Sequence, residues 1–144
     1  MITSKQAEQY FGNPKGDAVR KHLKLYTIPV EITSKIPCIP KRIYCNKLLY
    51  PLLIEALKLV IFRGLESEIK TFDGCYNVRP IRGYKDIWSI HSWAIAIDIN
   101  AKTNGLGKVG DMSPELVECF KSCGFDWGGD FERLDMMHMQ LHQL

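Results

Sequence analysis

The sequence predicts a single globular domain that contains both helices and strands. Its 144 residues are enough to bury one core, and nothing in the sequence divides the chain. Apolar residues recur every three or four positions between Asn46 and Gly64, which predicts a helix. Apolar and polar residues alternate over 93–99 and 137–142, which predicts two strands. The hydrophobic fraction of 46% and the charged fraction of 24% are ordinary for a soluble protein, so only motifs can indicate a function.

Charge, cysteine content and apolar runs argue against several classes of protein. The formal net charge is only +3 and the cations are scattered, which disfavours nucleic acid as a partner. The densest basic stretch, residues 15–24, is expected to be a solvated helix face, and the alternative is a patch that binds a polyanion such as nucleic acid or anionic cell wall. Five cysteines, an odd number without dense spacing, predict reduced thiols. Because the sequence has no apolar leader and no run long enough to span a bilayer, we expect a protein that is cytoplasmic as synthesised and does not insert into membranes. We also expect it to be a monomer.

The first 45 residues are expected to form an N-terminal helix followed by an extended arm. Residues 3–11, TSKQAEQYF, begin with a Thr/Ser cap and are followed by Gly12, where the helix should end. Three prolines interrupt residues 26–46, so regular structure should not be continuous there. We expect short edge strands and an extended arm packed on the core.

The remaining residues, 46–144, should supply the main core elements. Asn46 can cap the long helix, and Pro51 falls in its first turns, where a missing N–H is tolerated. A strand is expected within residues 69–78. A further helix should start at Ser113-Pro114, with serine as cap and proline first in the helix, and should stop at Gly124.

Residues 89–100, SIHSWAIAIDIN, place a histidine and an aspartate beside a run of alanine and isoleucine. A strand would put Trp93, Ile95, Ile97 and Ile99 on one face and Ala94, Ala96 and Asp98 on the other. His91 has the opposite parity to Asp98, so a continuous strand would point the two side chains apart. They can meet only if His91 precedes the strand, with the chain bending at Ser92-Trp93.

Residues 135–142, DMMHMQLH, form the second polar pattern. A strand here would place His138 on a polar face, and Asp135 would lie on the turn leading in. A buried carboxylate or imidazole needs a partner or a metal. Together His91, Asp98 and His138 would leave a fourth zinc position open, as catalytic sites do. The alternative is that each is an ordinary hydrogen-bonded or turn residue.

A second metal hypothesis uses the same tail. Its ligands would be Cys119, Cys123, His138 and His142, whose spacing roughly fits a Cys2His2 zinc finger that binds nucleic acid. The core positions of such a finger would fall near Trp127 and Asp135, which do not suit them. Two cysteines four residues apart on a helix commonly pack as small apolar side chains. We therefore disfavour the finger.

Two sequence blocks resemble the zinc D-Ala-D-Ala carboxypeptidase and L-alanyl-D-glutamate endopeptidase family, which includes phage endolysins and D,D-dipeptidases. SIHSWAIAIDIN is similar to S-x-H-x-x-G-x-A-x-D, with Ser89, His91, Ala96 and Asp98 in register. Residues 124–141, GFDWGGDFERLDMMHMQL, are similar to the C-terminal block G-F-x-W-G-G-D … D-P-M-H-F-[EQ].

A third segment and two departures complete the comparison with the family pattern. Residues 74–83, GCYNVRPIRG, resemble the block that supplies an arginine. Ala94 replaces the usual glycine and is expected to narrow the cleft slightly, and Met136 replaces the usual proline. Neither departure removes a metal ligand.

The resemblance implies an α+β fold of the Hedgehog/DD-peptidase type, in which a small antiparallel sheet carries one Zn²⁺ ion and helices pack behind it. The implied metal ligands are His91, Asp98 and His138. Asp135 is implied as a general base and then acid, passing a proton from water to the leaving amine. Arg79 is our first choice for stabilising the oxyanion.

Three further residues, Ser89, Arg82 and Gln140, are expected to bind substrate, and Arg82 is the second choice for the oxyanion. Trp127 is expected to anchor the Gly128-Gly129 turn in the core. On this resemblance, residues 1–144 form one peptidase domain whose catalytic core is residues 46–144.

The implied function is hydrolysis of peptidoglycan stem peptides by a zinc metallopeptidase. We expect an L-alanyl-D-glutamate endopeptidase of phage-lysin type, which would reach the wall through a holin or as part of a virion. A D-Ala-D-Ala carboxypeptidase or dipeptidase is one alternative. The other is a non-catalytic, zinc-containing wall-binding module of the same fold.

Overall fold

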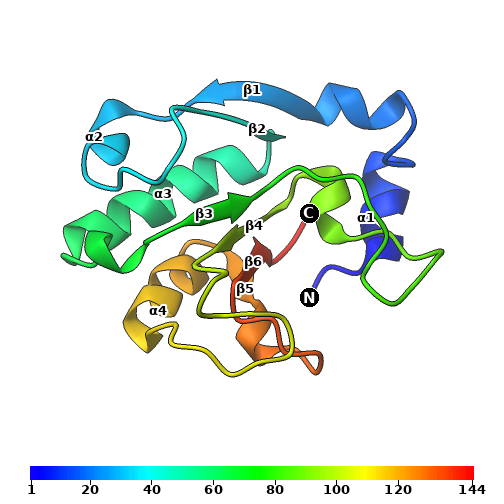
Figure 1. The fold of residues 1–144 in the computed structure, drawn as a ribbon. Coiled ribbons are helices and arrows are strands. Elements are labelled where there is room, and N and C mark those ends of the chain that lie inside the picture. Colours follow the sequence, from blue (N-terminus) through cyan, green and yellow to red (C-terminus); the bar gives the residue numbers. More distant parts are fainter.

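Two small antiparallel sheets and the helices packed on them make up the protein, as a computed structural model of residues 1–144 shows (Figure 1). The α-helices are α1 (Ser4–Phe11), α2 (Val30–Thr33), α3 (Leu49–Phe62) and α4 (Pro114–Ser122). The strands are β1 (Leu23–Thr27), β2 (Arg42–Asn46), β3 (Phe72–Gly74), β4 (Ala96–Ile99), β5 (Phe125–Trp127) and β6 (His138–Leu141). Short 3₁₀ helices cover Ala18–His22, Glu66–Glu68, Ile90–Trp93 and Gly128–Asp130. The predicted α+β class is in agreement with this architecture.

The four-stranded sheet has the order β3-β4-β6-β5, so the strands from the two sequence blocks are central neighbours. Strands β4 and β6 run antiparallel, with Ala96 opposite Gln140 and Asp98 opposite His138. The predicted strands over these blocks are confirmed, although β4 begins later than expected. Strand β5, at the sheet edge beside β6, had no clear signal in the sequence.

One face of this sheet belongs to the core and the other carries polar side chains. The core includes Ile97 and Ile99 of β4 together with Met139 and Leu141 of β6, all at most 1% exposed. The alternation of side chains then turns Asp98, His138 and Gln140 to the opposite face. The parity argument made for these strands is therefore confirmed.

Helix α1 begins and ends where the sequence predicts. Thr3 caps it through its hydroxyl, which accepts from the Gln6 N–H, while the Gln6 side chain accepts from the Thr3 N–H. This reciprocal pair satisfies two backbone donors that no backbone carbonyl of the helix can satisfy. The helix ends at Gly12, whose φ of 90° lies in the left-handed region that favours glycine.

The basic stretch 15–24 is not the helix face that the sequence predicted. A 3₁₀ helix covers Ala18–His22, and β1 then starts at Leu23 and pairs with β2. Pairing along β2 satisfies backbone groups that a helix would have had to satisfy internally. The expected extended arm is likewise interrupted by α2, which follows Pro29.

The two longer helices, α3 and α4, pack against the sheets. Helix α3 starts at Leu49, three residues after Asn46, whose side-chain oxygen instead accepts from the Leu48 N–H in the turn leading in. Its buried residues are Leu49, Leu53, Ala56, Leu57 and Val60. Helix α4 has the predicted Ser113 cap, which accepts from Leu116 N, and it contacts both α3 and β5. In Figure 1, α3 lies between the β1–β2 pair and the larger sheet.

No helix combines the length and apolar character needed to cross a membrane.

Candidate metal centre

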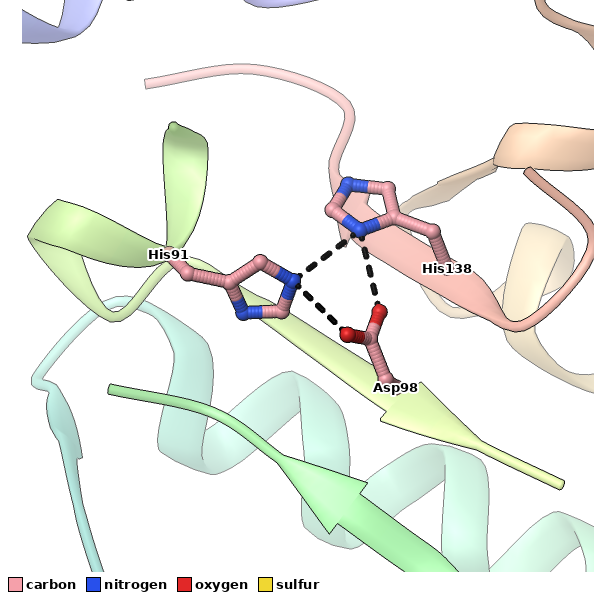
Figure 2. Close-up of side chains that lie close together, drawn as sticks. All are labelled: His91, Asp98 and His138. Atoms are coloured by element: carbon pink, nitrogen blue, oxygen red, sulfur yellow. Dashed lines mark hydrogen bonds and ion pairs between the residues drawn. The ribbon is translucent and has the colours of Figure 1, made fainter. Parts of the chain in front are cut away.

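Three side chains from different parts of the chain converge on the polar face of the sheet. His91 Nε2 lies 3.2 Å from Asp98 Oδ2 and 3.2 Å from His138 Nδ1, and His138 Nδ1 lies 3.2 Å from Asp98 Oδ1 (Figure 2). One ligand atom from each residue lies within 4.8 Å of the others, so the group could hold a metal ion. The side chains of His91 and His138 are 6% and 9% exposed, which excludes most solvent from their nitrogens.

His91 reaches the centre from the 3₁₀ helix Ile90–Trp93 that precedes β4. Ser89 caps this turn by accepting from the His91 N–H. The prediction that His91 precedes the strand is confirmed, but the predicted bend at Ser92-Trp93 is wrong. The left-handed residue is Ala94, with φ of 53°, because Ser92 and Trp93 still belong to the 3₁₀ helix. Trp93 is therefore not on the strand face assigned to it.

Ala94 has a different effect from the one expected. Its side chain is fully buried in the core and does not line the cavity, so the expected narrowing of the cleft is wrong. The replacement of glycine acts on the backbone instead, because an L-residue in the left-handed region costs about 1–2 kcal/mol. The chain takes this conformation in order to turn from the 3₁₀ helix into β4.

Each histidine has one ring nitrogen that points away from the centre, which we call the outer nitrogen. The hydrogen bond that this nitrogen makes indicates whether the other, inner nitrogen can bind a metal. His91 Nδ1 lies 2.8 Å from the Cys75 carbonyl oxygen, which can only accept, so Nδ1 carries the proton. His138 Nε2 lies 3.0 Å from Gln140 Oε1 and donates to it. Fixing one ring nitrogen as donor leaves the other with a free lone pair. The inner nitrogens, His91 Nε2 and His138 Nδ1, therefore face the centre as acceptors.

The pKa shifts of Asp98 and His138 show that the three groups need a positive charge between them. Burial alone would raise the pKa of Asp98, but hydrogen bonds from His138 and His91, which form when the inner ring nitrogens are protonated, outweigh burial and lower that pKa. Burial lowers the pKa of His138, whereas Asp98, Asp135 and Gln140 together raise it by more, so the net shift is upward. Asp98 thus stays ionised and needs a proton or a metal ion close by.

The donor set fits a divalent metal ion. Two imidazole nitrogens and a carboxylate are ligands that zinc prefers. Two lone pairs facing each other at 3.2 Å are unfavourable unless a cation or a shared proton lies between them. Each histidine also donates its outer N–H to an oxygen, an arrangement that orients metal-binding histidines in proteins.

A cavity of about 730 Å³ opens over the three residues. All of the residues that the sequence singled out for catalysis or substrate binding line it, namely Asp135, Arg79, Arg82, Ser89 and Gln140. The structure thus brings the whole predicted set to one site. The N-terminal segment, including Ile2 and Lys5, also lines the cavity, and no signal in the sequence indicated that it would.

Asp135 is held beside the centre by a close backbone contact. Its N–H donates to the Gly128 carbonyl, and a Cβ on Gly128 would lie 2.1 Å from the Asp135 carbonyl oxygen. Burial raises the pKa of Asp135, and the charges of His138 and Asp98 act on it in opposite directions. Its Oδ1 atom is buried and has no hydrogen-bond partner. An orphaned carboxylate oxygen in a cavity is available for a ligand.

Arginine side chains line one side of the cavity. Arg79 is tied to the 3₁₀ helix that carries His91, because its carbonyl accepts from Ser89 N and its N–H donates to Ser92 Oγ. Arg82 is exposed. Arg133, which the sequence did not single out, also lines the cavity and donates to the Arg82 carbonyl at 2.7 Å. Its place between the two C-terminal motif residues Asp130 and Asp135 was the one available signal.

The two remaining predicted substrate residues have their polar atoms engaged with the protein. Ser89 Oγ accepts from the His91 N–H. Gln140 contacts His138 through Oε1, and its Nε2 donates to the Ile2 carbonyl at 3.1 Å. Trp127 lies as expected against the following glycines: its indole N–H donates to the Met136 carbonyl, and a Cβ on Gly129 would lie 2.3 Å from its ring.

The zinc-finger hypothesis is wrong. Cys119 is buried within α4, and His142 pairs with Asp126 at 2.8 Å on the surface. His138 instead belongs to the group with His91 and Asp98, which includes no cysteine. The finger spacing was fortuitous: Cys119 lies in α4, Cys123 follows as its C-cap, and neither lines the cavity at the centre.

Fold and site together define an α+β protein with a candidate mononuclear metal centre in a cavity. A family model described as D-alanyl-D-alanine carboxypeptidase matches residues 82–141. The matched segment contains all three candidate ligands and Asp135, but not Arg79. Searches of curated proteins and of solved structures found no match. The similarity therefore covers the segment that carries the centre, and the Hedgehog/DD-peptidase type of fold stays a prediction.

Proposed function

We propose that the protein is a zinc-dependent peptidase that cleaves peptidoglycan stem peptides. One observation carries this proposal: two inward-facing imidazole nitrogens and the Asp98 carboxylate meet at 3.2 Å in a cavity that also holds the unpartnered Asp135 carboxylate. The match of residues 82–141 to the D-alanyl-D-alanine carboxypeptidase model supports the same chemistry and substrate class.

His91, Asp98 and His138 would hold one Zn²⁺ ion. Three protein ligands leave a position open, as in catalytic rather than structural zinc sites. Zinc bound there would polarise the scissile carbonyl and lower the pKa of the attacking water.

The chain's own side chains supply the proton transfer and the charge stabilisation. Asp135 accepts the proton of the attacking water and passes it to the leaving amine. Its buried, unpartnered Oδ1 and its place three residues before His138 support this role. Arg79 stabilises the negative charge that develops on the carbonyl oxygen, with Arg82 as the second choice. The attachment of Arg79 to the turn that carries His91 supports that order.

For the bond cleaved, we propose L-alanyl-D-glutamate, on the resemblance to phage lysins. A second candidate is the terminal D-Ala-D-Ala bond, favoured by the description of the matching family. A non-catalytic wall-binding module is disfavoured, because such a module has no use for an unpartnered carboxylate next to the metal ligands.

Digestion of purified peptidoglycan tests the function and separates the two bonds. Zinc-loaded protein is incubated with peptidoglycan, and new termini are identified by mass spectrometry. New N-terminal D-glutamate indicates the endopeptidase, and released D-alanine indicates the carboxypeptidase. Asp98→Asn and a chelator serve as controls that should abolish cleavage. Failure of the zinc-loaded protein to cleave either bond would contradict the proposal.

A further inference from the structure

The N-terminal segment contacts both of the elements that carry the histidines. The Ile2 carbonyl accepts from Gln140 in β6. The Ser4 hydroxyl donates to the Trp88 carbonyl, just before the 3₁₀ helix that carries His91. At the other end of α1, the Gly12 carbonyl accepts from the Trp93 indole N–H at 2.8 Å, within that same 3₁₀ helix. Figure 1 shows α1 beside this part of the chain.

We propose that Gln140 is a positioning residue for the metal centre, and that it connects the N-terminal segment to the ligand His138. The N-terminal segment, which the sequence analysis placed outside the catalytic core, would then be part of the centre's supporting structure. This inference rests on the metal-binding part of the proposed function, and it is a different role for Gln140 from the expected binding of substrate.

The orientation of the Gln140 amide follows from its partners. The Ile2 carbonyl can only accept a hydrogen bond, so the amide nitrogen must face Ile2 at 3.1 Å. The amide oxygen therefore faces His138 Nε2 at 3.0 Å and must receive its proton. With the proton on Nε2, the lone pair on His138 Nδ1 faces Asp98 and His91. The position of Ile2 thus selects the tautomer of His138 that can bind a metal.

Burial of Gln140 and Ile2 strengthens this selection of the His138 tautomer. Gln140 is 2% exposed and Ile2 is 6% exposed, so water does not readily replace either bond. Gln140 and His138 are two residues apart on β6 and share a face, which keeps the amide next to the imidazole. The cross-strand neighbours of Gln140 are Asp126 on β5 and Ala96 on β4, and the small side chain of Ala96 leaves room for the amide. Loss of the acceptor would leave a buried N–H unsatisfied or allow the ring to change tautomer.

Two variants of Gln140 distinguish the effect of its hydrogen bond to His138 from the effect of its hydrogen bond to Ile2. Gln140→Met keeps the length of the side chain but removes both bonds. Gln140→Glu, as an ionised carboxylate, keeps an oxygen for His138 but has no proton to donate to the Ile2 carbonyl. Gln143→Met, at an exposed position just after β6, is the matched control. Competition with a chromophoric chelator gives zinc affinity for the full-length chain, and long-range ¹H–¹⁵N correlation spectra report which ring nitrogen of His138 carries the proton.

We expect Gln140→Met to weaken zinc binding by about 10- to 100-fold, in line with other residues that orient metal-binding histidines. The His138 proton should then no longer be confined to Nε2. Gln140→Glu should bind zinc like the wild type, while the amides of α1 exchange faster because the bond to Ile2 is lost. A side chain that served only for packing would give the same result in both variants.

Wild-type zinc affinity in Gln140→Met would overturn the proposal, and so would equally weak binding in Gln140→Glu. Unchanged exchange of the α1 amides in Gln140→Glu would overturn the link to the N-terminal segment. These measurements use no peptidoglycan. A wild-type protein that binds zinc but cleaves no stem peptide would contradict the proposed function alone.

Discussion

Asp98 and His138 are direct cross-strand neighbours, with Asp98 Oδ1 3.2 Å from His138 Nδ1. Backbone pairing between β4 and β6 fixes these two ligands relative to each other. His91 joins them from a turn that is anchored separately, through its cap Ser89 and its bond to the Cys75 carbonyl. Two candidate ligands are therefore set by the sheet and the third by the turn.

Zinc should stabilise the folded protein through this pair. Because the unfolded chain lacks the preformed site, free zinc at 100 times its Kd should raise the free energy of unfolding by about 2.7 kcal/mol. Asp98→Asn removes the charge that the ion needs and should abolish the increase. Thermal unfolding with and without zinc measures both. Asp17→Asn, at an exposed position, is the control and should respond like the wild type. An equal zinc response in Asp98→Asn would show that the ion binds elsewhere.

Asp135→Ala should separate catalysis from metal binding. The variant keeps all three ligands and should retain zinc, but it should lose at least about two orders of magnitude in rate because it lacks the proton acceptor. Stem-peptide cleavage and zinc content measure the two effects, and His138→Ala should instead lose the metal. Asp130→Asn, which removes a surface pair with Lys121, should stay close to wild type. A fully active Asp135→Ala enzyme would exclude the assigned role.

Gly128→Ala should displace Asp135. The new Cβ would lie 2.1 Å from the Asp135 carbonyl oxygen, so the backbone around Asp135 must move. Overpacking of this kind costs about 1–3 kcal/mol, and catalysis should fall further than zinc binding because Asp135 itself is not a ligand. Gly105→Ala is the matched control, since its Cβ would make only an ordinary contact of 3.8 Å with Lys108. Denaturant unfolding and cleavage rates would show no difference between the variants if this contact were unimportant.

Two buried alanines should respond differently to glycine. Ala94→Gly loses a buried methyl group, worth about 0.8 kcal/mol, and gains unfolded-chain entropy, but it relieves the left-handed strain at φ of 53°. These effects should nearly cancel, leaving the free energy of unfolding within about 0.5 kcal/mol of wild type. Ala96→Gly, in β4 and equally buried, relieves no strain and should cost about 1.5 kcal/mol. Equal destabilisation of the two variants, measured by denaturant unfolding, would contradict the strain at Ala94.

Much of the local structure could be predicted because its causes lie close together in the sequence. The Thr3 cap, the Ser113-Pro114 helix start and the alternation along β4 and β6 each depend on neighbouring residues. The same parity argument showed that His91 must lie outside the strand that carries Asp98. It could not locate the bend, because the left-handed conformation at Ala94 depends on the 3₁₀ helix and strand that it joins.

Other predictions failed where distant partners decide the conformation. Residues 15–24 have the charge pattern of a helix face, yet Leu23 and the following residues pair with β2 about twenty positions later in the chain. Gln140 was expected to bind substrate on its match to the family pattern, and that role stays a prediction. The hydrogen bond from its amide to Ile2, 138 residues away in sequence, is a contact that no local pattern could indicate.

The sequence by itself determined the elements that carry the candidate metal ligands, and their residue types indicated zinc chemistry. Only the tertiary structure decided that the three inner ligand atoms meet, which nitrogen of each histidine faces inward, and that the N-terminal segment forms a wall of the cavity. The physical reason is the distance along the chain over which each effect acts. Periodicity and capping act over a few residues along the chain, whereas ligand orientation depends on hydrogen bonds between buried groups that come together only when the whole chain folds.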